Sequence, residues 1–328
     1  MKKSYIGLFF LASFAVLAIC PWIGVQGISP SVIFDAANDP TGQEARIFWQ
    51  IRVPRVLLAW CAGATFGVCG MVFQALFRNP LAEPSLLGVS SGAALGAAAV
   101  IRLGLAGSAS SSPMMAVGAF IGAMLTIAII SGFSRMARST KDVTLLLAGV
   151  AISALFSSLI MVFQYTGGAS ETYKLLSWTM GGINVVGIEE GARAIPSLLI
   201  STALAVFYST ELDLITFGDE IASTRGVELE RTKRILFVGM SVAVAIVVAN
   251  CGPIAFLGLI APHIARMAAG PRHLRLTMLT AAVGGAALTI CDTAARTLWA
   301  PADLPVGIII SFLGAPFFLW LLFGSRKV

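Results

Sequence analysis

The chain contains nine long apolar runs that are free of Asp, Glu, Lys and Arg, and this pattern leaves few folds open to it. A helix needs roughly 20 residues to cross the hydrocarbon core of a bilayer. Only 12% of the residues are charged, whereas soluble domains carry about 25%. We therefore predict an all-α polytopic membrane protein. The runs are residues 4–34, 56–77, 84–101, 113–134, 143–170, 194–210, 235–262, 276–291 and 304–325.

One of these runs is long enough for two short helices. In residues 235–262 the sequence Asn250-Cys251-Gly252-Pro253 predicts a tight turn, so the expected number of spans is about ten. A shorter apolar stretch, residues 175–188, contains three glycines. It is expected to form a short or re-entrant helix, although an ordinary surface helix is an equally good interpretation. The first run continues well past Cys20, which favours an uncleaved first span over a cleaved signal peptide.

The positions of Lys and Arg predict the orientation in the membrane. Short cytoplasmic loops are enriched in these residues. If ten spans place both termini in the cytoplasm, fifteen of the 22 Lys and Arg residues lie on that side. The net charge of +6 then reflects topology and attraction to the lipid bilayer. No nucleic-acid partner is expected.

Residues 79–92 concentrate helix-breaking residues between two apolar runs. Asn79, Pro80 and Pro84 interrupt a helix. Irregular backbone at membrane depth is tolerated only where protein or a water-filled cavity satisfies its polar groups. We therefore expect this segment to line a pathway.

The sequence offers no catalytic motif. It has neither a G-x-x-x-x-G-K-[ST] phosphate loop nor an H-E-x-x-H motif, and its five cysteines form no C-x-x-C pair. We expect no enzyme activity, catalytic residue, cofactor or metal site. Glu83 and Asp292 are the only candidate intramembrane carboxylates, and both lie near span ends. A driving force must therefore come from elsewhere, which points to a partner.

The longest charged stretch, residues 211–234, suggests where that partner binds. It is predicted to form two short helices punctuated by Gly218 and Gly226. A solvated loop is the simplest interpretation. Its apolar residues favour a docking surface instead. They are Leu212, Leu214, Ile215, Phe217, Ile221, Val227 and Leu229.

Several motifs, in order along nearly the whole chain, resemble the membrane permease of bacterial ABC importers for ferric siderophores, haem and vitamin B12, the type II importer group. Each motif is weak alone, but their number, order and spacing make the match specific. The motifs lie at residues 52–55, 70–74, 79–84, 87–92, 145–150, 217–222, 252–266, 292–296, 304–307 and 314–318.

The resemblance implies a type II ABC importer permease fold in one domain, residues 1–328. It implies a homodimer in the bacterial cytoplasmic (inner) membrane, with the translocation path along the dimer interface. Two separate ATPase subunits would drive transport, and a periplasmic or surface-anchored binding protein would deliver the substrate. The segment matching the family's coupling helices, which sit in a cleft of each ATPase, comprises Phe217, Gly218, Asp219, Glu220, Ile221, Ala222 and Gly226.

Three arginines resemble outward-facing positions that, in the family, pair with acidic residues of the binding protein. These are Arg52, Arg55 and Arg296. Guanidinium groups bind carboxylates bidentately, which fits such a role. Two alternatives remain open. Arg52 and Arg55 could simply anchor the second span by snorkelling, and Arg296 could pair with Asp292 four residues earlier.

The resemblance also places a gate and a path. Asn79, Pro80 and Leu81 match a turn that forms part of the family's cytoplasmic gate. The fifth span resembles the helix that lines the path, and Gly149, Ser153 and Ser157 share a stripe on it. That stripe could equally be small-residue packing against another span.

The expected cargo is a metal chelate, either a ferric siderophore or haem. Vitamin B12 is the alternative, because Gly181-Gly182-Ile183 follows Trp178 where the family often has Gly-Ser-Leu, as in some vitamin B12 members. An ion-coupled secondary carrier is the alternative of a different class. His263 is expected to be structural, because the family carries its motif whatever the substrate.

Overall fold

The computed structural model describes residues 2–29, 42–106, 113–136 and 142–324, and every regular element in these ranges is a helix. The ends of the first and last predicted runs, residues 30–34 and 325, lie outside the described residues. The long helices are α1 (Lys2–Ile19), α4 (Val53–Leu76), α5 (Val89–Arg102), α6 (Pro113–Met136), α7 (Asp142–Thr166), α10 (Ile195–Phe207), α13 (Leu229–Cys251), α14 (Leu257–Ala269), α15 (His273–Leu298) and α16 (Val306–Gly324).

Short helical segments connect these long helices. They are η1 (Cys20–Trp22), α3 (Gln43–Arg46), η2 (Ile47–Arg52), η3 (Pro84–Leu87), α8 (Ala169–Thr179), α9 (Ile188–Gly191), η4 (Ala192–Ala194), α11 (Ser209–Phe217) and α12 (Asp219–Thr224).

The ten predicted spans each contain a helix. Within the described ranges, six helices are long and apolar enough to cross a membrane, and four shorter apolar helices accompany them. The shorter four are Gly7–Trp22, Val89–Arg102, Leu257–Ala269 and Val306–Trp320. The prediction of an all-α polytopic membrane protein is confirmed. Helix α1 ends at Ile19, earlier than its apolar run, because Pro21 and Gly24 follow and interrupt the helix.

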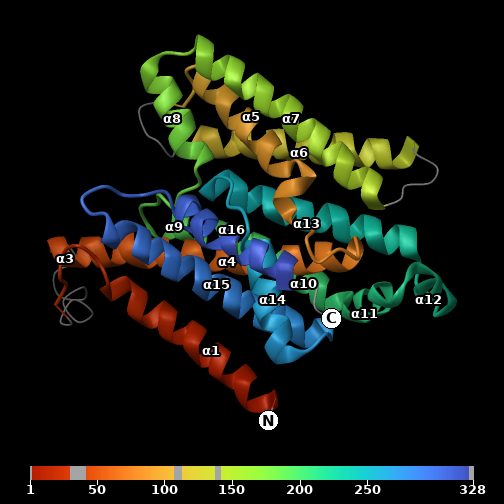
Figure 1. The fold of residues 1–328 in the computed structure, drawn as a ribbon. Coiled ribbons are helices and arrows are strands. Elements are labelled where there is room, and N and C mark those ends of the chain that lie inside the picture. Colours follow the sequence, from red (N-terminus) through yellow and green to blue (C-terminus); the bar gives the residue numbers. More distant parts are fainter. Residues whose placement is uncertain (1, 30–41, 107–112, 137–141, 325–328) are drawn as a thin grey trace.

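Helix α4 lies at the centre of the bundle (Figure 1). It contacts α10, α13, α14 and α15, and 20 of its 24 residues are buried. A Cβ atom on Gly70 would overlap the backbone of Gly258, so glycine is needed where α4 meets α14. Nearly every side chain of α4 therefore packs against protein and not lipid.

The helical stretch through α3, η2 and α4 begins at Gln43, before the predicted start of the apolar run at residue 56. The charge-free run missed these residues because arginines occur in a continuous helix. Pro54 has no N–H to offer the carbonyl of Gln50 four residues earlier. That carbonyl instead accepts a hydrogen bond from the Gly187 N–H at 2.7 Å. This bond attaches the residue before α9 to η2.

Helices α5, α6, α7 and α8 form a second group, which lies above α13 in Figure 1. Helices α5 and α6 are packed with their backbones almost in contact, because Cβ atoms on Gly92, Gly96, Gly118 or Gly122 would overlap the facing helix. Small residues allow such close packing between membrane helices.

Two irregular segments meet near the centre of the structure. Helix α13 ends at Cys251 and α14 begins at Leu257, so the predicted interruption is present, but it lies at residues 252–256 and not at 250–253. The short helix predicted at 175–188 lies earlier, at 169–179, because Gly181 adopts a φ of 71° that ends it. The extended chain that follows is held by hydrogen bonds from Gly182 N–H to the Cys251 carbonyl at 2.8 Å and from Gly307 N–H to the Gly181 carbonyl at 3.2 Å.

Different helices and connections lie at the two ends of the bundle. Helices α11 and α12 and the turn at residues 77–83 lie at the end where the chain also starts and finishes (Figure 1). We call this the α12 end. Segments α3, α8 and α9 and the connection at 299–305 lie at the opposite end, which we call the α3 end.

Candidate functional site

The turn at residues 77–83 connects α4 to η3 at the α12 end. Arg78 has a φ of 46°, in the left-handed region. The Asn79 N–H donates to the Gln74 carbonyl at 3.1 Å, and the Asn79 side-chain oxygen accepts a bond from the Leu81 N–H at 2.9 Å. Asn79 thus forms an Asx turn that fixes the backbone before and after Pro80. The three residues predicted to form a gate therefore make one tightly defined turn.

Helices α11 and α12 form the predicted coupling segment and are joined by Gly218, whose φ is 128°. Phe217 is 73% exposed and Ile221 is 48% exposed. Leu212 and Ile215 are fully buried, because α11 packs against α4 and α15. The prediction that this segment presents apolar side chains is therefore right for Phe217 and Ile221 and wrong for Leu212 and Ile215.

Acidic residues attach this segment to three other elements. Asp213 Oδ1 accepts a 2.9 Å hydrogen bond from the backbone N–H of His273, at the start of α15, and lies 2.6 Å from its Nδ1. Asp219 Oδ2 lies 3.1 Å from the Lys233 ammonium in α13 and 3.5 Å from the Arg78 guanidinium in the turn after α4. The predicted coupling segment is thereby joined to the predicted gate turn by an ion pair.

Glu83 is the last residue of the same turn, and its side chain is buried. Its side chain is 5% exposed, and burial raises its pKa to about 7, against hydrogen bonds from the Phe256 backbone and the Ser85 side chain. Phe256 has a φ of 65° and immediately precedes α14. Glu83 therefore connects the gate turn to the break between α13 and α14. The sequence feature that could have indicated this role is its position in the irregular stretch 79–92.

The arginines predicted to dock a binding protein all lie at the α3 end, and each of them forms hydrogen bonds or ion pairs within the chain. Arg52 is 4% exposed. Its guanidinium donates to the carbonyl oxygens of Pro21, Trp22 and Gln26. In this structure Arg52 therefore holds the segment after α1 and does not present its charge to solvent.

Arg55 is bound by two carboxylates. Its Nε and Nη2 atoms donate to Asp292 at 3.0–3.1 Å, and its Nη1 and Nη2 atoms donate to Asp303 at 3.0 and 3.1 Å. Asp292, predicted as a possible partner of Arg296, thus pairs with Arg55 from another helix. The half-buried Arg296 donates to the Cys20 carbonyl at 2.8 Å. No sequence spacing could have found the Arg55 pairs, because 237 and 248 residues separate the partners.

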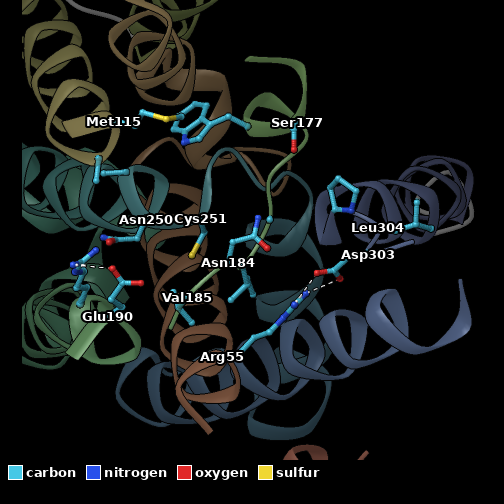
Figure 2. Close-up of a pocket in the computed structure, with 17 residues that line it drawn as sticks. Arg55, Met115, Ser177, Asn184, Val185, Glu190, Asn250, Cys251, Asp303 and Leu304 are labelled. Atoms are coloured by element: carbon cyan, nitrogen blue, oxygen red, sulfur yellow. Dashed lines mark hydrogen bonds and ion pairs between the residues drawn. The ribbon is translucent and has the colours of Figure 1, made fainter. Parts of the chain in front are cut away.

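A small cavity of about 80 Å³ lies beside Arg55 (Figure 2). Asn184 and Val185 of the extended segment, Asn250 and Cys251 at the end of α13, and Asp303 line it. Ligand pockets for drug-sized molecules are typically about 300–1,000 Å³, so this cavity has room for a few water molecules only. It is a polar junction between three connections and does not form a chelate path.

The three residues predicted to line a path lie on α7 and differ in their surroundings. Ser153 Oγ accepts a 3.2 Å hydrogen bond from Ser91 Oγ at the start of α5, and Gly149 is buried beside Gly88. Ser157 is exposed. Gly149 and Ser153 thus fit the packing alternative, whereas Ser157 faces outward from the chain.

His263 packs edge-on against the Phe317 ring of α16, with ring centroids 5.6 Å apart. In the part of the chain that the structure describes, no group of three or more His, Cys, Asp or Glu side chains could hold a metal ion. The contact of His263 is therefore a packing contact between α14 and α16.

The arrangement of helices is that of an ABC transporter permease. A solved structure described as an inward-facing conformation of a metal-chelate type ABC transporter superimposes with a TM-score of 0.86, at 28% identity over 98% of this chain and 99% of that one. The chain belongs to the FecCD transport family, whose model matches residues 10–324.

Curated relatives agree on the class and differ in their cargo. The cobalamin import system permease protein BtuC of Halobacterium salinarum is 39% identical, over 83% of this chain and 72% of the relative. The hemin transport system permease protein HmuU of Yersinia pestis is also 39% identical, over 86% of this chain and 84% of the relative. The iron(3+)-hydroxamate import system permease protein FhuG of Bacillus subtilis is 32% identical, over 95% of this chain and 94% of the relative. This chain is accordingly a multi-pass membrane permease of the ABC importer type.

Proposed function

We propose that the chain, as a single permease domain, carries a metal chelate, either a ferric siderophore or haem, across the bacterial inner membrane. It works as a homodimer, with its path at the dimer interface and both termini in the cytoplasm. Two separate ATPase subunits drive it, and a binding protein delivers the chelate at the α3 end. The relatives named for haem and for iron(3+)-hydroxamate support this cargo class.

The observation that carries the proposal is the connection between α12 and the turn after α4. Phe217 and Ile221 offer exposed apolar side chains that a cleft in an ATPase could enclose. Asp219, in the same segment, is paired with Arg78 of the turn that contains Asn79 and Leu81. Movement of α12 on ATP binding would therefore pull on the gate turn directly. The proposal therefore has the α12 end facing the cytoplasm.

Vitamin B12 is the second candidate cargo. The relative named for cobalamin has the same identity to this chain as the relative named for haem. Gly181 and Gly182, the sequence feature that favoured this cargo, lie against the ends of α13 and the start of α16. Gly181 has a φ of 71° and its Cβ would overlap the Pro253 carbonyl, so the backbone accounts for this glycine without a ligand. Gly182 has room for a side chain, so packing does not account for it and this residue remains in favour of vitamin B12.

The test is uptake into proteoliposomes that contain the permease with its ATPase, supplied with the binding protein. A ferric siderophore, haem and cyanocobalamin are compared with and without ATP. ATP-dependent accumulation of a ferric siderophore or haem is the expected result. Accumulation of cyanocobalamin alone would transfer the cargo assignment to the second candidate, and accumulation without ATP or ATPase would indicate an ion-coupled secondary carrier.

A further inference from the structure

The two carboxylates that bind Arg55 differ sharply in their exposure to solvent. The side chain of Asp292 is 1% exposed, whereas that of Asp303 is 49% exposed. Both are bonded to the same guanidinium, which is itself 12% exposed. Figure 2 shows Arg55 extended along the wall of the cavity with Asp303 at its tip. One partner of Arg55 is therefore enclosed and the other is open to water.

This difference determines which bond can exchange. A buried ion pair cannot be opened without leaving an uncompensated charge in the protein interior. An exposed pair contributes little, because water solvates both groups when they separate. The Asp292 pair is thus much more costly to open than the Asp303 pair. Another carboxylate arriving from solvent could replace Asp303.

The donors of Arg55 leave little room for an additional partner. A guanidinium has five N–H groups. The Nε and Nη2 atoms bond to Asp292, while Nη1 and Nη2 bond to Asp303. An incoming carboxylate would gain a bidentate contact with the outer edge of Arg55 only where Asp303 now lies.

Asp303 also determines what would move when that pair opens. It lies in the connection 299–305 between α15 and α16. On the other side of this connection, Gly307 donates to the Gly181 carbonyl. The ion pair of Asp303 with Arg55 therefore attaches residues 299–305 to α4, and these residues lead directly into α16. Its release would free residues 299–305 while α16 stayed attached to the segment after α8.

We infer that Asp303 is an internal competitor for Arg55, which an acidic side chain of the docking protein displaces, releasing the connection between α15 and α16. This inference rests on the proposed function, in which a binding protein delivers the chelate at the α3 end, and on the sequence prediction that Arg55 pairs with one of its carboxylates. The competition weakens docking, and each docking event releases residues 299–305 from Arg55.

The first experiment measures the affinity of the binding protein for the assembled permease–ATPase complex in lipid nanodiscs. We expect Asp303→Asn to tighten docking about two- to fivefold, the range set by loss of an exposed ion pair. Glu190→Gln is the matched control. It removes the same charge from the same cavity, but Glu190 pairs with Arg193 and accepts a bond from the Val186 N–H. The control should leave the affinity within measurement error.

A second readout follows the connection itself. A nitroxide label on Trp299→Cys, at a side chain that is 53% exposed, reports local mobility by electron paramagnetic resonance. The five native cysteines are all buried, which limits background labelling. Mobility should rise when the binding protein docks. In the Asp303→Asn background it should already be high without the binding protein.

The outcomes separate this inference from the docking assignment. Arg55→Met combined with Asp292→Asn removes both charges of the buried pair without leaving either one unpaired. If this double variant docks normally, Arg55 is not a docking residue and both ideas fail. If the double variant docks weakly but Asp303→Asn behaves like Glu190→Gln in both readouts, docking at Arg55 stands and the competition by Asp303 is refuted.

Discussion

The carboxylate of Asp219 lies 3.5 Å from the guanidinium of Arg78, so the first residue of α12 is paired with the turn that ends α4. The same carboxylate oxygen lies 3.1 Å from the Lys233 ammonium in α13. These groups are partly exposed, and such pairs contribute about 0–1 kcal/mol to stability. The importance of this pair therefore lies in what it connects. It joins a surface suited to an ATPase to the predicted gate.

Replacing Asp219 with Asn should uncouple the ATPase from the gate while the protein stays folded. Mutations along a coupling route change the coupling free energy by about 0.5–2 kcal/mol, so the stimulation of ATP hydrolysis by loaded binding protein should fall at least about twofold. The measurement compares stimulated with basal hydrolysis in the complete complex. Glu228→Gln is the control, because Glu228 forms an exposed pair with Arg231 in the same segment. Equal stimulation in both variants would contradict the prediction.

The exposed apolar surface of α12 gives a second prediction. Ile221→Asp should abolish transport and stimulated hydrolysis, because a charge would enter the cleft that the ATPase offers to this side chain. The side chain is 48% exposed, so the isolated permease should fold normally. Ile188→Asp, at a residue that is 55% exposed at the α3 end, is the control. Co-purification of the ATPase subunits measures assembly, and normal transport by Ile221→Asp would place the coupling contact elsewhere.

Loss of the buried pair of Arg55 with Asp292 should lower the stability of the permease, whatever its effect on docking. Replacing Arg55 with Ala leaves the Asp292 carboxylate in the interior without its partner. Breaking a buried pair in this way costs about 3–5 kcal/mol. We expect a clear decrease of the Tm of the purified permease in nanodiscs, followed by tryptophan fluorescence. Arg55→Met with Asp292→Asn should recover most of the loss, because it leaves no buried charge.

Charge reversal at Arg52 and Arg55 would look like a simple test of docking, but its result would be ambiguous. Both side chains are enclosed and bonded within the chain. Weak docking by a reversed variant would therefore have two physical causes, lost attraction and damaged packing. A Tm identical to the wild type in the Arg55→Ala variant would show that the Asp292 pair contributes little, and charge reversal would then be a direct test of docking.

The sequence was sufficient for the helices and insufficient for the ion pairs that join them. Apolar runs located the six long and four shorter apolar helices of the described residues, because the cost of burying backbone in lipid acts on each segment separately. The arginines of the second span were visible, but their partners were not. Arg55 and Asp292 meet only because α4 packs against α15. The start of that helical stretch was missed because buried hydrogen bonds allow Arg52 to lie inside it.

The coupling segment illustrates the same limit. Its two short helices and the glycine between them were predicted from local signals, since Gly218 needs a φ that other residues avoid. Which apolar residues point outward was not predicted. Leu212 and Ile215 are buried by contacts of α11 with α4 and α15, and these contacts depend on the whole bundle.

Glu83 gives a prediction of pH dependence. Burial raises its pKa from 4.5 to about 7 in the folded protein. Below about pH 4.5 the carboxyl is protonated in both the folded and the unfolded state, and its contribution to stability is then at its maximum. As the pH rises toward 7, the unfolded state loses this proton and the folded state keeps it, so stability falls by up to about 3 kcal/mol and then levels off.

Glu83→Gln removes that titration and keeps a side chain of similar shape beside Phe256 and Ser85. The variant and the wild type should unfold at similar temperatures near pH 5, whereas at pH 8 the variant should be the more stable. The Tm in nanodiscs, recorded from pH 5 to pH 8, measures this difference. Glu171→Gln serves as the control, because Glu171 is an exposed carboxylate paired with Arg102 at the α3 end. If the Tm of Glu83→Gln and of the wild type follow the same course with pH, Glu83 ionises as readily in the folded protein as in the unfolded chain, and the carboxyl at the break between α13 and α14 is charged at neutral pH.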